Sequence, residues 1–88
     1  MSEKELEKIL KALANKRRLL ILRLLKHRKS VSVGDIARHI KLSIKATSKH
    51  LSILYSAGIV EREQISLSVL YSFASNLSRP TSHILSIL

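Results

Sequence analysis

Cysteine and tryptophan are absent from this sequence of 88 residues, glycine occurs twice and proline once. Without cysteine the chain has no disulfide framework, no thiolate ligand for a metal and no thiol for a redox switch. Aromatic residues make up only 3% of the chain, so leucine, isoleucine and valine must build the core. We expect one small aliphatic domain over residues 1–88.

Apolar runs and catalytic motifs are equally scarce. The longest uncharged apolar run, residues 19–22, is far shorter than the roughly 20 residues that cross a membrane. Residues 1–5 lack the basic head and apolar stretch of a secretion signal, so we expect a cytoplasmic protein without membrane contact. Gly34 and Gly58 are too few for a glycine-rich phosphate loop, and no acid pair or matched serine and base marks a cleft. An enzyme is therefore not expected.

Candidate metal ligands are dispersed along the chain. No acid follows Glu63, and the four histidines lie on separate segments without an i, i+4 pair: His27, His39, His50 and His83. A zinc site needs about four well-placed ligands. We expect no metal and no cofactor.

Positive charge, in contrast, is abundant and concentrated in one segment. The sequence has 16 Lys and Arg against 6 Asp and Glu, a net charge of +10. Residues 8–50 contain 13 of these cations and a single acid, Asp35, whereas residues 51–88 contain two cations and two acids. A surface that serves only solubility would mix the two signs, so this segment is typical of a protein that binds a polyanion.

Capping residues and apolar spacing predict two helices in the first third of the chain. Ser2 and Glu5 have the spacing of a capping box, and apolar residues at i, i+3, i+4 and i+7 follow, so a helix should cover residues 3–13. Asn15 is placed to cap a second helix that ends near residues 27–29 and is apolar on nearly every side. We expect this second helix to be central and buried.

Two further helices joined by a short turn are predicted next. A capping signal at residues 32–35 predicts a helix over about 33–41. Ser43 is placed to cap a helix over 44–57, and Gly58 suits a left-handed C-terminal cap. The buried stripe of the last helix is expected to consist of Thr47, Leu51 and Leu54.

The apolar pattern changes to a period of two after the fourth helix. Residues 59–64 and 69–73 alternate as strands do and predict a β-hairpin with its tip near residues 66–68. Pro80 then opens a last helical segment over 81–88. The fold class is therefore mainly α within α+β: a winged helix-turn-helix with about five helices and one hairpin wing.

The exposed face of the 44–57 helix favours DNA binding. In a helix-turn-helix the second helix enters the major groove, so its outer face must carry cations and small polar groups. Four such residues recur here at i, i+4, i+7 and i+11: Lys45, Lys49, Ser52 and Ser56. A solvated lysine face explains an isolated helix of this kind, but the short preceding helix, the hairpin and the concentrated charge all favour DNA.

Three cations in the first turn of the second helix oppose the helix dipole. Lys16, Arg17 and Arg18 each cost on the order of 0.3–1 kcal/mol there when exposed. Two interpretations stay open for Arg18. In the first it forms an ion pair with Asp35 or with a glutamate, and in the second it binds phosphates together with Lys16 and Arg17. Arg17 is a candidate phosphate contact under both interpretations.

Two stretches resemble the ArsR-type winged-helix repressors. Residues 13–25 read LANKRRLLILRLL and are similar to that family's opening LADPTRLRILRLL. Residues 42–60 read LSIKATSKHLSILYSAGIV and are similar to its LSQSTVSRHLKVLREAGLV. The resemblance covers about residues 6–73 and implies a dimeric repressor on double-stranded DNA. It also implies DNA-facing positions at Ile44, Lys45, Ala46, Ser48, Lys49 and His50.

The sequence departs from the family pattern at three places. Lys41 stands where glycine is common, and Ile44 replaces a usual polar residue at the start of the recognition helix. The wing tip, residues 64–68, is uncharged and partly apolar, which leaves Arg62 as the one basic wing candidate for a DNA contact.

A homodimer is expected from the balance of apolar and charged residues. The mean hydropathy is +0.11 although 25% of residues are charged, so the chain has more aliphatic surface than one small core covers. A two-fold dimer places two recognition helices about 34 Å apart and requires an inverted-repeat operator. The apolar faces left for this interface are Leu6, Ile9, Leu10, Leu13, Ile84, Leu85, Ile87 and Leu88.

Two other functions remain open from the sequence. The apolar wing and C-terminal segment fit a winged-helix module that binds a protein partner, with basic helices that serve only solubility. A DNA-binding protein without sequence specificity is the other alternative. Binding to duplex DNA at physiological salt separates the protein-interaction module from the rest. The sequence identifies no small-molecule effector.

Overall fold

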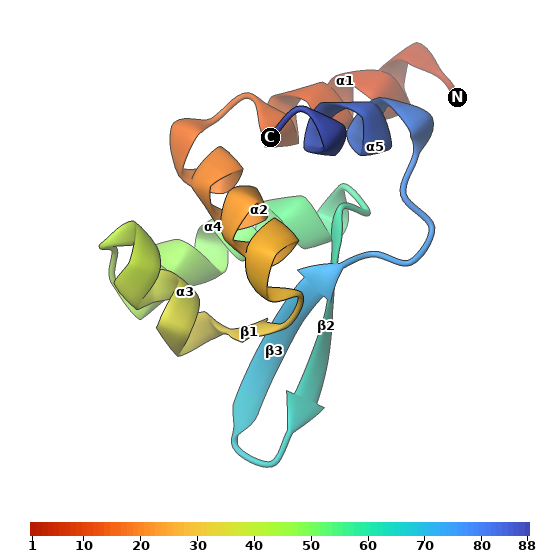
Figure 1. The fold of residues 1–88 in the computed structure, drawn as a ribbon. Helices are drawn as coiled ribbons and strands as arrows, with labels where there is room; N and C mark the ends of the chain where they lie inside the picture. Colours follow the sequence, from red (N-terminus) through yellow and green to blue (C-terminus); the bar gives the residue numbers. More distant parts are fainter.

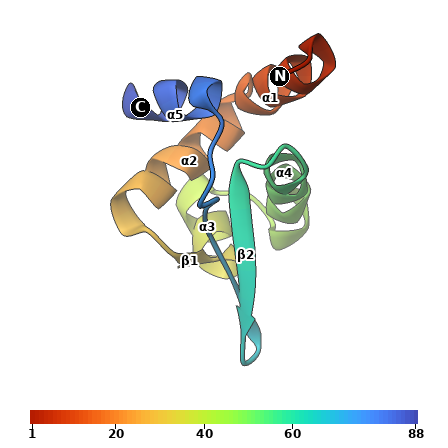
Figure 2. The same cartoon turned by 90° about the vertical axis from the view of Figure 1, so that its right-hand side faces the viewer.

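The computed structural model describes residues 1–88 as five α-helices and a three-stranded antiparallel sheet. The helices lie above the β2–β3 hairpin, which extends away from them as the wing (Figure 1). Seen after a 90° turn, α1 and α5 both lie at the end opposite to the wing tip, on the two sides of the molecule (Figure 2). In chain order the elements are α1 (Glu3–Leu13), α2 (Lys16–Arg28), β1 (Val31–Ser32), α3 (Val33–Ile40), α4 (Ile44–Ser56), β2 (Val60–Ile65), β3 (Ser68–Phe73) and α5 (Arg79–Ser86).

Side-chain caps explain why the first four helices begin where the sequence predicts. The Ser2 hydroxyl accepts from the Glu5 amide at 3.1 Å while the Glu5 carboxylate accepts from the Ser2 amide at 3.3 Å, which completes the capping box. Asn15, Ser32 and Ser43 each accept from the amide three residues ahead, at 3.1–3.2 Å. Each cap satisfies an amide that the helix itself leaves unpaired and contributes about 1 kcal/mol.

Two elements differ from the sequence prediction. The last helix begins at Arg79 rather than residue 81, because Ser78 caps it and Pro80 fits its first turn. Strand β1 was not expected, since two residues are too few to show an alternating pattern. It forms because Val31 pairs with Tyr71 on β3, which gives the sheet order β1-β3-β2.

Left-handed backbone marks the turns that orient the recognition helix. Gly58 ends α4 with φ +73°, as predicted, and Lys41 ends α3 with φ +59°. The Lys41 amide donates to the Ala37 and Arg38 carbonyls and so closes α3 tightly. Ser66, with φ +57°, forms the turn at the wing tip.

The core is aliphatic and centred on α2. This helix packs against α1, α3, α4, α5 and β3, which confirms its predicted central position. The predicted inner stripe of α4 is confirmed as well, since Thr47, Leu51 and Leu54 are each 0% exposed. The fully buried core side chains include Ile21, Leu22, Leu25, Ile36, Leu51, Leu54, Ile59, Val31 and Val60.

Candidate nucleic-acid interface

Helices α3 and α4 form a helix-turn-helix whose second helix turns a polar face outward. The two helices pack against each other across the short turn that begins at Lys41. Because the stripe of Thr47, Leu51 and Leu54 faces the core, the opposite side of α4 faces solvent. The four residues predicted for that side are all exposed: Lys45, Lys49, Ser52 and Ser56.

The remaining expected DNA-facing residues of α4 lie beside this exposed row. Ile44, the first residue of the helix, has 57% of its surface exposed. Ala46, Ser48 and His50 are half-buried. These three half-buried residues therefore border the outer face of α4 and do not form its centre.

Arg18 links the recognition helix to the end of α1. Its Nη1 lies 3.2 Å from His50 Nδ1, and its Nη2 donates to the Lys11 carbonyl at 3.0 Å. Its Nε donates to the Ala12 carbonyl. The interpretation that Arg18 pairs with Asp35 or a glutamate is wrong. The last carbonyls of α1 carry negative partial charge and no intrahelical partner, so they attract the guanidinium instead.

Asp35, the other half of that interpretation, has a local partner. It forms an ion pair with Arg38 one turn later on α3. A pair three residues apart on one helix forms without any long-range packing. Arg18 is thus left to bridge α1, α2 and α4.

The surroundings of His50 favour the neutral form of its ring. Burial lowers the pKa of His50, and the charges of Arg18 and Arg17 lower it further. Because a guanidinium only donates, Nδ1 must accept and the ring proton sits on Nε2. The contact between Arg18 and His50 also places the exposed, cationic start of α2 beside α4.

A cation–π contact joins the wing to the recognition helix. The Arg62 guanidinium carbon lies 4.1 Å from the centre of the Tyr55 ring. Arg62 stands in β2 opposite Tyr71 of β3, well away from the wing tip. The wing's basic side chain is therefore directed at α4 and not at the end of the hairpin.

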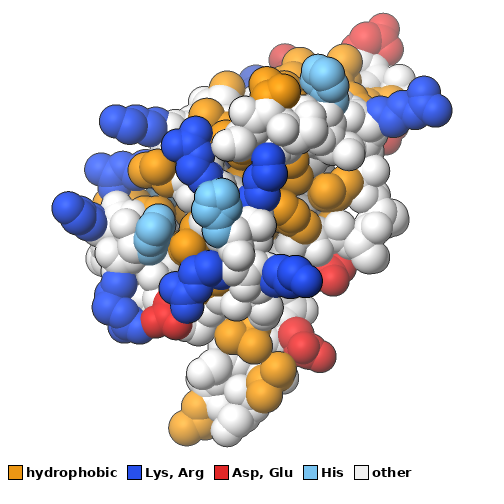
Figure 3. Space-filling view, viewed as in Figure 1, with side chains coloured by type: hydrophobic (Ala, Val, Ile, Leu, Met, Phe, Trp, Pro, Cys, Tyr) orange, Lys and Arg blue, Asp and Glu red, His pale blue; other side chains and the backbone are white.

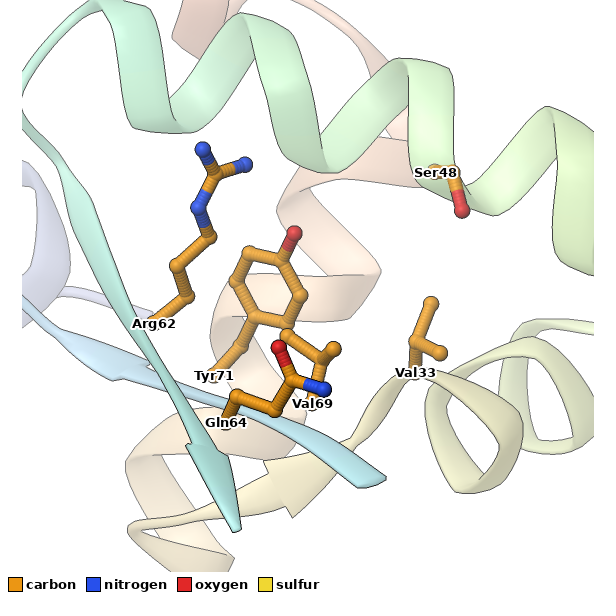
Figure 4. A pocket seen from close by; sticks show the side chains of 6 residues that line it. All are labelled: Val33, Ser48, Arg62, Gln64, Val69 and Tyr71. Carbon is orange, nitrogen blue, oxygen red and sulfur yellow. The ribbon is translucent and has the colours of Figure 1, made fainter. Parts of the chain in front are cut away.

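A groove of about 440 Å³ separates α4 from the wing. In Figure 4, Arg62, Gln64, Val69 and Tyr71 project from the sheet toward α4, and Ser48 and Val33 close the other side. Of these residues only Ser48 and Arg62 were singled out from the sequence. Sequence spacing gives no signal for the others, because the groove is assembled from α3, α4, β2 and β3.

Charge and apolar character are separated on the surface. Figure 3 shows Lys and Arg side chains gathered over the helices on the left, while the lower end of the wing carries hydrophobic and uncharged side chains. At the tip Ile65 is 51% exposed and Leu67 is 98% exposed. The long-range attraction for a polyanion thus comes from the helices.

The residues expected at a dimer interface divide into two groups. Ile9, Leu13 and Leu85 are buried in the core of the protomer itself, at 7%, 5% and 5% exposure. Leu10 and Ile87 are 48% and 72% exposed. The half-buried members are Leu6, Ile84 and Leu88. An apolar surface on α1 and α5 therefore remains, but it is narrower than the sequence pattern implies.

Potential metal ligands stay dispersed in the folded chain. No three His, Cys, Asp or Glu side chains come together where they would hold a metal ion. The helices are also too short or too polar for a membrane, since none of the five has the length and apolar character needed to cross one.

A helix-turn-helix followed by a hairpin wing, with a basic outer face on its second helix, defines the winged helix-turn-helix class. The sequence matches the family described as bacterial regulatory protein, arsR family, over residues 15–62. The chain therefore belongs to the ArsR family, as its resemblance predicted.

Two curated relatives are similar over most of this chain. The HTH-type transcriptional regulator YgaV of Escherichia coli K12 is 36% identical over 64 residues, which is 73% of this chain and 65% of the relative. The transcriptional activator HlyU of Vibrio cholerae O1 is 39% identical over 67 residues, or 76% and 61%. The match thus spans slightly less than two thirds of either relative. Both are transcriptional regulators and not enzymes, in agreement with the sequence.

Solved structures share the fold over nearly the whole chain. HlyU from Vibrio cholerae has a TM-score of 0.82 at 30% identity, covering 99% of this chain and 92% of its own. A homodimeric winged helix-turn-helix DNA-binding domain from Mycobacterium bovis, a possible ArsR-family regulator, has a TM-score of 0.81 at 27% identity. That comparison covers 99% of this chain and 82% of the other. These likenesses confirm the predicted fold class.

Proposed function

We propose that this protein binds double-stranded DNA sequence-specifically as a homodimer on an inverted-repeat operator and represses transcription there. The observation that carries the proposal is the outer face of α4. It presents Lys45 and Lys49 with small hydroxyl side chains, above a stripe of three fully buried residues. Lysine binds guanine edges or phosphates, and a serine hydroxyl can donate to or accept from a base edge.

Phosphate contacts are assigned to cations that flank α4. Arg17 is exposed at the start of α2, directly before Arg18, which contacts His50 on α4. Arg62 lines the groove between α4 and the wing together with Ser48. Cations on both sides of the recognition helix hold the two backbones of a major groove and set its register.

Dimerisation is assigned to the exposed apolar residues of α1 and α5. Leu10 and Ile87 have exposed apolar side chains, whose burial against a second protomer would be favourable. The related domain from Mycobacterium bovis is described as homodimeric. To bind an inverted repeat, a dimer whose two-fold axis passes through this end of the molecule must place its two α4 helices about one DNA turn apart.

Repression follows if the operator overlaps a promoter, because a bound dimer then excludes the polymerase. The relative HlyU is named an activator, so the direction of regulation needs its own measurement. Transcription in vitro from a promoter that contains the operator should fall as protein is added. A rise in the amount of transcript would show that the protein is an activator and not a repressor. The proposed DNA-binding site would not be affected by that result.

Selection of bound sequences from a random duplex pool tests the proposal. We expect an inverted repeat to be enriched and bound about 1,000-fold or more tightly than random duplex at physiological salt. Equal binding to every duplex would identify a non-specific DNA-binding protein. No binding at that salt would favour the protein-interaction module, for which Leu67, 98% exposed at the wing tip, is the favouring observation.

A further inference from the structure

An isoleucine occupies the start of the recognition helix without any packing role. Ile44 directly follows the cap residue Ser43 and has 57% of its surface exposed. It is not part of the core cluster or of the apolar residues packed against it. A β-branched side chain in this position adds neither helix propensity nor burial, so its exposed surface is free to contact another molecule.

The place of Ile44 on α4 directs it toward the DNA. Ile44 and Ser48 are four residues apart and therefore lie on one side of the helix. Ser48 lines the groove between α4 and the wing, so Ile44 stands at the N-terminal end of that side. Residues at the N-terminal end of a recognition helix are the ones that reach base edges.

The chemistry of the side chain selects one feature of the major groove. Isoleucine has no donor and no acceptor, so it cannot pair with the polar edges of guanine, adenine or cytosine. Placing it over such an edge would remove water from a polar group and leave that group without a partner. The C5-methyl group of thymine is the one apolar group that the bases present there.

We propose that Ile44 is a specificity-determining residue that packs against the C5-methyl group of a thymine in each half-site. This inference rests on the proposed function. It predicts a thymine at one fixed position of the selected operator, repeated on the opposite strand by the two-fold symmetry of the dimer.

Replacement of thymine by deoxyuridine tests this contact, because it removes the methyl group and leaves every hydrogen-bonding edge intact. Each thymine of the selected operator is replaced in turn, in both half-sites together, and affinity is measured by fluorescence anisotropy. One position should weaken binding by about 4-fold per half-site, the effect of one buried methyl group, or about 16-fold for the dimer. The Ile44→Ala variant should bind the thymine operator and the operator with deoxyuridine at that position equally.

Ile53→Ala is the matched control, since Ile53 is also an isoleucine of α4 and is 43% exposed. This variant should keep the full deoxyuridine effect at the position assigned to Ile44. Thermal unfolding confirms that both variants are folded. If the protein selects an operator but Ile44→Ala retains the deoxyuridine effect, or no position shows one, the inference is wrong and the proposed function stands. If no sequence is selected, the proposed function fails and the inference with it.

Discussion

The guanidinium of Arg18 lies 3.2 Å from Nδ1 of His50 and ties the central helix to the recognition helix. The same guanidinium donates to the carbonyls of Lys11 and Ala12 at the end of α1. One side chain thus joins the recognition helix to the helix that carries Leu10, which we assign to the dimer interface. A shift of α1 on dimerisation would therefore be transmitted to α4 through the Arg18 side chain.

Removal of this bridge should destabilise the protein. Arg18→Ala leaves two α1 carbonyls and the His50 ring without their charged donor, and we expect a loss of about 2–3 kcal/mol in the free energy of unfolding. Arg17→Ala, which removes an exposed neighbour, should change it by less than about 0.5 kcal/mol. Urea unfolding of both variants measures the difference. Equal stabilities would show that the bridge contributes nothing.

The His50 ring should make stability depend on pH. Because its pKa is lowered in the folded state, the unfolded chain binds the proton more readily, and stability falls as pH is lowered. The contribution is complete above the unfolded pKa of about 6.5 and is lost as pH falls through the lower folded value. His50→Gln keeps an acceptor for Arg18 but does not titrate. Between pH 7.5 and 5 the parent should lose more unfolding free energy than this variant, and parallel pH profiles would contradict the assignment.

Charge placed on the apolar end should separate the protomers. Leu10→Glu and Ile87→Glu alter exposed side chains, so each variant should stay folded while its dimer dissociates. Sedimentation equilibrium should show a dimeric parent and monomeric variants at micromolar concentration, with correspondingly weaker operator binding. Ile53→Glu, an exposed isoleucine on α4, is the control and should remain dimeric. A monomeric parent would remove the dimer from the account.

Local signals explain which parts of the fold the sequence predicts. The caps at Ser2, Asn15, Ser32 and Ser43 act within three residues, so spacing alone reveals them. Gly58 likewise marks its turn through its own backbone, with φ +73°. The starts of the first four helices, the outer face of α4 and the hairpin could be predicted for this reason, whereas the cap of α5 at Ser78 was missed.

Long-range contacts explain what could not be predicted. Strand β1 exists only because Val31 meets Tyr71, and Arg18 meets His50 across 32 residues. An apolar stripe in a sequence also does not distinguish a residue that packs in the protomer's own core from one that packs against a second protomer. The apolar pattern therefore predicts Ile9 at the dimer interface, although the protomer buries it in its own core.

The central claim, that the outer face of α4 binds DNA, is tested most directly by two charge reversals measured side by side. Lys49 and Arg79 are both exposed cations, one on α4 and the other at the start of α5. Affinity for the selected operator is measured by fluorescence anisotropy at several salt concentrations for the parent, Lys49→Glu and Arg79→Glu. Both variants have the same net charge, so only position distinguishes them.

Lys49→Glu should bind the operator about 100-fold more weakly, and its salt dependence should be shallower by about 0.9 for each phosphate that the variant no longer neutralises. Arg79→Glu should stay within about 3-fold of the parent with an unchanged slope, because an exposed charge far from the DNA acts only through the screened long-range field. Equally weakened binding in the two variants, or full affinity in Lys49→Glu, would contradict the assignment of α4 as the recognition helix.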